Sequence, residues 1–114
     1  MNQGIGTVIY PVKDIARAKK LFSKLLGVKP YMDEPYYVGY QVGNQDIGLD
    51  PNGFSQGMTS PVSYYHVSDI EKNLQLLLEE GAKVMQNVKD VGGCKLIASV
   101  KDTEDNIIGR IQLP

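Results

Sequence analysis

The chain has 114 residues, 42% of them hydrophobic and 22% charged, which is the composition of one ordinary globular domain. Its net charge of −1 gives no overall electrostatic reason to expect nucleic acid or an anionic membrane as a partner. We find no secretory signal and no apolar run near the ~20 residues of a membrane span, and the single cysteine excludes an internal disulfide. We therefore expect a cytoplasmic protein.

The first half of the chain predicts one strand, one helix and three further short strands. Residues 4–12 are β-branched and apolar, and Asp14 can cap the helix that follows. Gly27 provides the left-handed exit from this helix. The helical stripe that we expect to be buried consists of Ile15, Ala18, Phe22, Leu25 and Leu26. The later strands are expected at about 29–33, 36–42 and 45–50, before a loop over 51–60.

The second half repeats this order. A strand at about 61–67 precedes Ser68-Asp69-Ile70-Glu71, which we interpret as a capping box, and Gly81 ends the helix. The predicted buried stripe of this helix consists of Ile70, Leu74, Leu77 and Leu78. Strands are expected at about 83–89, 95–101 and 106–112, with Cys94 as a semi-buried strand residue and Arg110 on a solvated edge.

The two halves are copies of one βαβββ unit. Asp14-Ile15 in the first copy corresponds to Asp69-Ile70 in the second, 55 positions further on. One unit cannot bury its own apolar face, so two must pack together. The sequence therefore predicts a single α+β domain over 1–114, with one βαβββ module at about 1–52 and another at about 60–114.

Strand alternation predicts which side chains point away from the helices. Because each helix covers one sheet face with the more apolar set, the remaining set should line the other face. Set side by side, the two helix-free faces would form a cleft with polar groups among aromatic rings, as small organic ligands require. The predicted ligand-binding residues are Thr7, Tyr37, Gln41, Asp50, Tyr64 and His66.

The chain resembles the vicinal oxygen chelate superfamily, which includes glyoxalase I, extradiol dioxygenases and bleomycin-resistance proteins. The resemblance rests on Val12-Lys-Asp-Ile15 and Val67-Ser-Asp-Ile70, and on Lys101-Asp-Thr-Glu-Asp-Asn-Ile-Ile-Gly109, which is similar to the family's Asp-Pro-x-Gly-Asn-x-x-Glu ending. It implies two βαβββ modules whose sheets form a curved, cleft-bearing half-barrel with the helices outside. It also implies homodimers, although one chain carries both modules.

The residues at the family's metal-ligand positions differ from the family pattern. By resemblance, metal-dependent members use a His seven residues before each Asp-Ile cap and a Glu on the last strand of each module. These four positions correspond to Thr7, Val62, Gly48 and Gly109. None supplies a good ligand, and Asp46, Asp50 and His66 would form at best a weak site. We therefore expect no metal and no other cofactor.

Three functions remain open at this point. The first is a metal-independent binding protein for a small organic ligand, of the glyoxalase and bleomycin-resistance type. The second is a metal-independent isomerase or lyase with His66 as general base, since histidine is the side chain that ordinarily titrates near neutral pH. A metal, if found, would point instead to a glyoxalase-like lyase or a dioxygenase. The third is an interaction module without a ligand. Contact with a ligand, catalysis and a structural partner are all open for His66.

Overall fold

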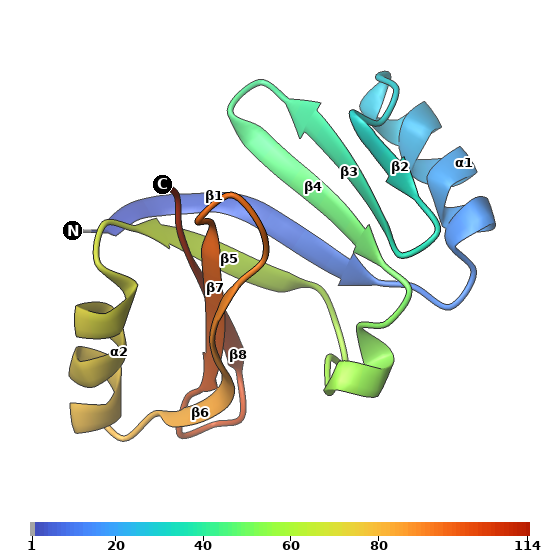
Figure 1. Ribbon diagram of the computed structural model, residues 1–114. Helices are drawn as coiled ribbons and strands as arrows, with labels where there is room; N and C mark the ends of the chain where they lie inside the picture. Colours follow the sequence, from blue (N-terminus) through green and yellow to red (C-terminus); the bar gives the residue numbers. More distant parts are fainter. Residues whose placement is uncertain (1) are drawn as a thin grey trace. The chain divides into compact units, whose positions relative to one another are not determined.

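The computed structural model describes residues 2–114, and its chain divides into two compact units (Figure 1). The unit called N-terminal here is Thr7–Val62, and the unit called C-terminal is Ser63–Pro114 together with residues 2–6. The strand β1 therefore contributes to both units. Each unit combines one α-helix with mixed β-strands, which confirms the α+β class and the repeated order of elements.

The N-terminal unit places helix α1 on one face of four strands. Its strands lie in the order β2-β3-β4-β1, where β1 and β4 are parallel and the other neighbours are antiparallel. The predicted strand at 45–50 has the observed bounds, whereas β2 is shorter and later than predicted, and the loop contains a short 3-10 helix. The bounds are β1 Asn2–Pro11, α1 Ile15–Leu26, β2 Met32–Glu34, β3 Tyr37–Val42, β4 Gln45–Asp50 and η1 Phe54–Gln56.

Local signals begin and end α1 as predicted. The Asp14 carboxylate accepts a hydrogen bond from the Arg17 N–H at 3.1 Å, and Gly27 leaves the helix at a φ of 70°. The core beneath α1 is Val38, Tyr40 and Leu49, against which four of the five predicted helix residues pack. The exception is Leu25, which is 69% exposed. Position 25 is 100° around the helix from Leu26, which is enough to turn it toward solvent.

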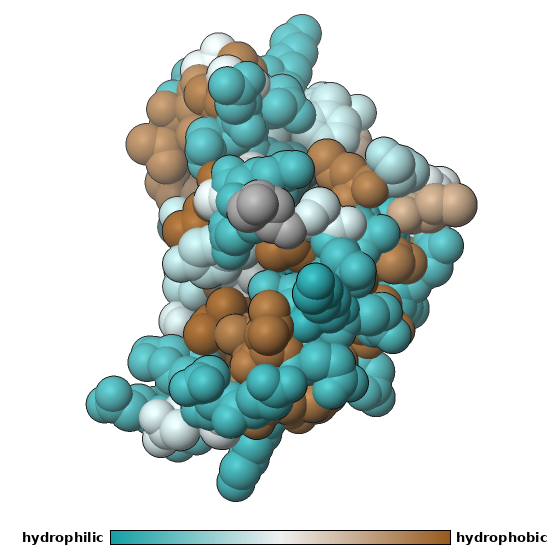
Figure 2. All heavy atoms as spheres, turned by 90° about the vertical axis from the view of Figure 1, so that its left-hand side faces the viewer, coloured by the Kyte–Doolittle hydropathy of each residue, from teal (hydrophilic) through white to brown (hydrophobic). Residues whose placement is uncertain are grey.

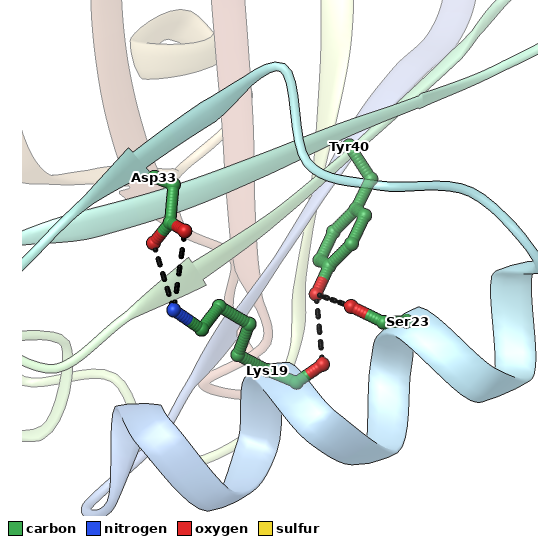
Figure 3. Close-up of polar contacts among 4 residues, drawn as sticks. All are labelled: Lys19, Ser23, Asp33 and Tyr40. Carbon is green, nitrogen blue, oxygen red and sulfur yellow. Dashed lines mark hydrogen bonds and ion pairs between the residues drawn. The ribbon is translucent and has the colours of Figure 1, made fainter.

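Tyr40 ties α1 to the strands beneath it (Figure 3). Its hydroxyl donates to the Lys19 carbonyl oxygen at 3.0 Å and lies 2.9 Å from the Ser23 hydroxyl, so a buried polar atom is satisfied at the centre of the core. On the same helix the Lys19 ammonium bonds to the Asp33 carboxylate of β2 at 3.1 Å. The orientation of α1 on this sheet is thus set by polar as well as apolar contacts.

The C-terminal unit repeats the arrangement with helix α2. Its strands lie in the order β5-β8-β7-β6, with β5 and β8 parallel and the other neighbours antiparallel. Val67, Ile70 and Ala98 form the core beneath α2, and the Ile70 N–H donates to the Gln112 side chain at 2.8 Å. The bounds are β5 Val62–Val67, α2 Ile70–Glu79, β6 Lys83–Asp90, β7 Leu96–Lys101 and β8 Ile107–Gln112.

Three details of this unit correct the sequence interpretation. The N-cap of α2 is Asp69, which accepts from the Lys72 N–H at 3.1 Å, whereas the predicted capping box required Ser68 at that position. Leu78 was placed in the buried stripe but is 37% exposed. Cys94 was placed in a strand but is exposed in the turn before β7, at a φ of 65°.

Arg110 is the largest correction, because it is buried rather than on a solvated edge. Only 1% of the residue is exposed, and its Nη1 donates to the Asn73 side chain of α2 at 3.1 Å. Its Nε and Nη2 are buried without a hydrogen-bond partner among the described residues. Burial lowers the pKa of Arg110, although the negative charge of Glu71 opposes this effect.

In the described part of the chain, no helix is long and apolar enough to cross a membrane.

Candidate functional site

The N-terminal unit has one sheet face that α1 does not cover. Val38, Tyr40 and Leu49 pack beneath the helix, so the residues that alternate with them point to the opposite side. We call this opposite side the N-terminal face. It carries Tyr37, Gly39, Gln41, Asp46, Gly48 and Asp50.

The ring of Tyr37 lies over the backbone of Gly48 on this face. A Cβ atom built on Gly48 would overlap the Tyr37 hydroxyl and lie 2.6 Å from its Cζ atom, closer than real Cβ atoms come to other heavy atoms. Glycine inside a strand often marks a place where another group approaches the backbone, as it does here. Because position 48 has no side chain, an aromatic ring can lie directly against the strand backbone there.

Tyr31 makes a second contact of the same kind with a strand glycine. Its phenol lies over Gly39, which is the register partner of Gly48, and its hydroxyl donates to the Asp46 carboxylate at 2.9 Å. Partial burial raises the pKa of Tyr31 to about 12, and the hydrogen bond to Asp46 and its negative charge add to the effect. The phenol therefore stays neutral and keeps its proton as a donor across the physiological pH range.

The other two predicted residues of this face have local roles. Asp50 accepts a hydrogen bond from the Asn52 N–H at 2.8 Å, which is the turn-stabilising contact that aspartate commonly makes before a turn. Gln41 is exposed, and its side-chain amide donates to the Gly43 carbonyl oxygen at 3.2 Å in the hairpin between β3 and β4. The carboxylate of Asp50 and the amide of Gln41 still lie on the N-terminal face.

The C-terminal unit has a matching uncovered face. Val67 and Ala98 pack beneath α2, so Tyr64 and His66 of β5 point to the other side, which we call the C-terminal face. The Tyr64 ring lies over Gly109, its register partner in β8, where a Cβ would overlap the Cδ2 atom and lie 2.6 Å from Cγ and Cε2. The His66 imidazole lies over Gly6, where a Cβ would be 2.6 Å from its Nε2 atom.

The six predicted residues therefore divide between two surfaces. Thr7, Tyr37, Gln41 and Asp50 belong to the N-terminal unit, and Tyr64 and His66 belong to the C-terminal unit. Thr7 and Tyr64 are only 2% and 4% exposed, whereas Tyr37, Asp50 and His66 are half-buried. That both faces line one cleft remains a prediction.

The residues at the four family ligand positions do not fit a divalent metal. Val62 has no donor atom, and the Thr7 hydroxyl is a poor ligand on a buried residue. At Gly48 and Gly109, rings of Tyr37 and Tyr64 fill the space that a ligating side chain would need. Within residues 2–114, no three side chains of His, Cys, Asp or Glu gather closely enough to hold a metal ion.

Sequence reasoning missed the pairing of Tyr31 with Asp46 and the contact of His66 with Gly6. Tyr31 was considered only as one aromatic ring among several, because its partner lies 15 positions away on another strand. The available signal was the pair of strand glycines at positions 39 and 48, which are opposite each other in the register. Such glycines suggest that side chains from neighbouring positions cross the backbone there.

Comparison with known proteins identifies the family. The model of the Glyoxalase/Bleomycin resistance protein/Dioxygenase superfamily matches residues 4–108. A search of curated proteins gives no match.

Three solved structures share the fold at low sequence identity. A hypothetical protein from Bacillus halodurans is 14% identical, with a TM-score of 0.76 and coverage of 99% of this chain and 95% of that one. A glyoxalase/bleomycin resistance protein/dioxygenase superfamily member from Vibrio splendidus is 15% identical, with a TM-score of 0.71 and 98% coverage of both chains. Methylmalonyl-CoA epimerase from Mycobacterium tuberculosis is 15% identical, with a TM-score of 0.72 and coverage of 99% and 89%.

Proposed function

Because the chain belongs to the Glyoxalase/Bleomycin resistance protein/Dioxygenase superfamily, we propose that it is a metal-independent member that binds a small organic molecule. One observation carries this proposal. At the two positions where metal-binding relatives are expected to present a carboxylate, this chain has glycines, and the rings of Tyr37 and Tyr64 lie over them. Aromatic rings in place of ion ligands favour contact with an organic ligand over coordination of a cation.

The charges on the N-terminal face indicate the ligand class. Asp46 and Asp50 lie there with Tyr31 and Tyr37, and residues 30–71 contain no lysine or arginine. A strongly anionic ligand would meet carboxylates with no local cation to offset the repulsion. A flat ligand that is neutral or positively charged would instead stack on the tyrosine rings and meet a complementary charge. We propose such a ligand.

The test begins with mass spectrometry of the gently purified protein under native conditions, with elemental analysis of the same sample. The proposal expects a bound organic mass, or a thermal shift with neutral or cationic aromatic compounds, that a chelator leaves unchanged. A ligand at 100 times its Kd adds about 2.7 kcal/mol to the free energy of unfolding. Stoichiometric zinc, nickel or iron in the elemental analysis would refute metal independence.

Two tyrosine variants locate the ligand. Tyr37→Ala should weaken binding about tenfold or more if the ring over Gly48 contacts the ligand. Tyr36→Ala is the matched control, because Tyr36 is 58% exposed and precedes β3. Equal affinity of the two variants would refute the N-terminal face as the binding surface.

A second candidate function is an isomerase or lyase that uses His66 as general base. The observation that favours it is the half-buried imidazole of His66 on the C-terminal face. The structural likeness to an epimerase supports the fold alone at 15% identity. Turnover that His66→Gln abolishes and a chelator does not affect would favour the enzyme, whereas unchanged turnover would exclude His66 as the base.

A further inference from the structure

The charge of the chain is unevenly distributed, although its sum is close to zero. Residues 13–29 contain six basic side chains and one acidic side chain, whereas the rest of the chain contains six basic and twelve acidic side chains. The structure places most of this basic segment on α1 and at its two ends. A nearly neutral net charge therefore conceals a local positive surface.

The outward side of α1 is apolar as well as basic. Leu21 and Leu25 are 65% and 69% exposed, although the core beneath α1 is already filled by the opposite side of the helix. Leu21 lies between Arg17, four positions before it, and Lys24, three positions after it, so the three side chains share one stripe. We call this stripe, with Lys20 and Leu25, the α1 face.

Two grooves adjoin the α1 face. The first has a volume of about 930 Å³ and runs between α1 and the 3-10 helix η1, where Leu21 and Phe54 contribute to its walls. The Lys13 ammonium lies 5.4 Å from the centre of the Phe54 ring and adds a cation beside it. The second groove has a volume of about 750 Å³ and is lined by Lys20 and Lys24, among others. A partner with apolar and acidic side chains would fill such a surface.

Helix α2 has the complementary character. Leu76 and Leu78 are 53% and 37% exposed, and apolar side chains are visible among hydrophilic ones on the side of the molecule that carries α2 (Figure 2). Glu79 and Glu80 lie three and four positions after Leu76, with Lys72 one turn before it. We call the stripe from Lys72 to Glu80 the α2 face.

The acids of the α2 face are unfavourably placed within their own chain. They occupy the last turn of α2 and its C-cap, where the helix dipole is negative, and that turn contains no basic residue. Arg17 is in the reverse situation, because it lies in the first turn of α1, where the dipole is positive. Contact between the two helices would offset both unfavourable interactions, because each helix end would then lie near charges of the opposite sign.

We propose that the α1 face of one copy of this chain binds the α2 face of a second copy. Leu21 would pack near Leu76, with the cations of α1 opposite Glu79 and Glu80. Each contact joins two unlike surfaces, so two copies that pair reciprocally form a two-fold dimer, whereas pairing with a third copy extends to a ring or an open chain.

The test measures the mass of the assembly by sedimentation velocity. At roughly 0.5 mM chain and about 20 mM salt, wild type should exceed the monomer mass, and about 0.5 M salt should weaken association because it screens exposed charges. Leu21→Gln with Lys24→Gln removes the α1 face, and Leu76→Gln with Glu79→Gln removes the α2 face. Each double variant should associate at least about tenfold more weakly than wild type.

Mixing the two double variants is the decisive step. Each retains the face that the other lacks, so the mixture should form a one-to-one complex of twice the monomer mass that does not extend further. Leu113→Gln with Lys101→Gln is the matched control, because it removes an exposed leucine and an exposed lysine elsewhere, and it should associate like wild type.

Several outcomes would overturn the proposal. A single double variant that still forms dimers at wild-type strength would indicate an interface that does not use the removed face, and a mixture that stays monomeric would exclude pairing of the two faces. A wild-type protein that stays monomeric would also overturn the proposal. If such a monomer binds phosphatidylglycerol vesicles or polyglutamate through the α1 face, that surface has another occupant.

Discussion

Replacement of Gly109 by alanine tests the contact between the Tyr64 ring and the backbone of β8. An alanine Cβ at this position would lie 2.6 Å from the Cγ and Cε2 atoms of Tyr64. Ordinary carbon contacts are about 3.5–4.0 Å, so the ring or the strand must move by roughly 1 Å. Tyr64 is 4% exposed and pairs in register with Gly109, so its ring has little free space into which to turn.

The magnitude follows from two opposing effects. Overpacking a buried position typically costs about 1–3 kcal/mol of the free energy of unfolding. Replacing glycine by alanine recovers about 0.4–1 kcal/mol, because the unfolded chain loses freedom, and Gly109 is not among the glycines with positive φ. We therefore expect Gly109→Ala to lower the free energy of unfolding by about 1–2 kcal/mol.

Gly48→Ala is the matched control for this experiment. The atoms in its way belong to the far end of the Tyr37 side chain, and Tyr37 is half-buried, so less of the surrounding structure has to move with it than with the buried Tyr64 ring. The cost and the entropic gain should then nearly cancel, leaving a change below about 1 kcal/mol. Urea unfolding followed by circular dichroism measures both variants. A Gly109→Ala protein as stable as wild type would refute the placement of the Tyr64 ring over that backbone.

Four further predictions concern single side chains. Arg110→Met should raise the free energy of unfolding by about 1 kcal/mol or more, because it removes two buried donors without partners and loses only one hydrogen bond, to Asn73. A loss of stability in urea unfolding would show that the guanidinium is better paired than the structure indicates. In absorbance titration near 295 nm, Tyr31 should ionise at a pKa of about 12; its raised pKa contributes stability that is complete below pH 10 and is lost as pH rises through 12. Asp46→Asn should shift this titration downward but not fully to 10, since burial is the larger cause, and an unchanged titration would exclude the hydrogen bond. Asp69→Ala should destabilise the protein by about 1 kcal/mol through loss of the α2 cap, as thermal unfolding would detect.

Local patterns were sufficient to predict the elements of this fold. The helix at Ile15–Leu26 follows from the cap at Asp14, the apolar spacing and the exit at Gly27, all of which lie within one short segment. The repeat at an interval of 55 residues predicted that the second half would fold in the same order. These signals act between neighbours in the chain, so they can be recognised without knowledge of the packing.

The same patterns could not decide which leucines face solvent or which polar groups are buried. Leu25 and Leu78 lie at the edges of their helical stripes, where a rotation of the helix on its sheet changes their exposure. Arg110 pairs in register with Ala98 on the side of the sheet that α2 covers, and an arginine in a strand gives no local sign of such burial. These outcomes depend on contacts between segments distant in sequence.

The sequence by itself determined the βαβββ repeat, the cap of α1 at Asp14 and the absence of good metal-ligating side chains at Thr7, Val62, Gly48 and Gly109. Only the tertiary structure decided what lies over those glycines, because the rings of Tyr37 and Tyr64 come from neighbouring strands whose register is set by sheet pairing. A strand's own sequence specifies which side chains alternate, whereas the groups that cross its backbone are specified by the strands beside it.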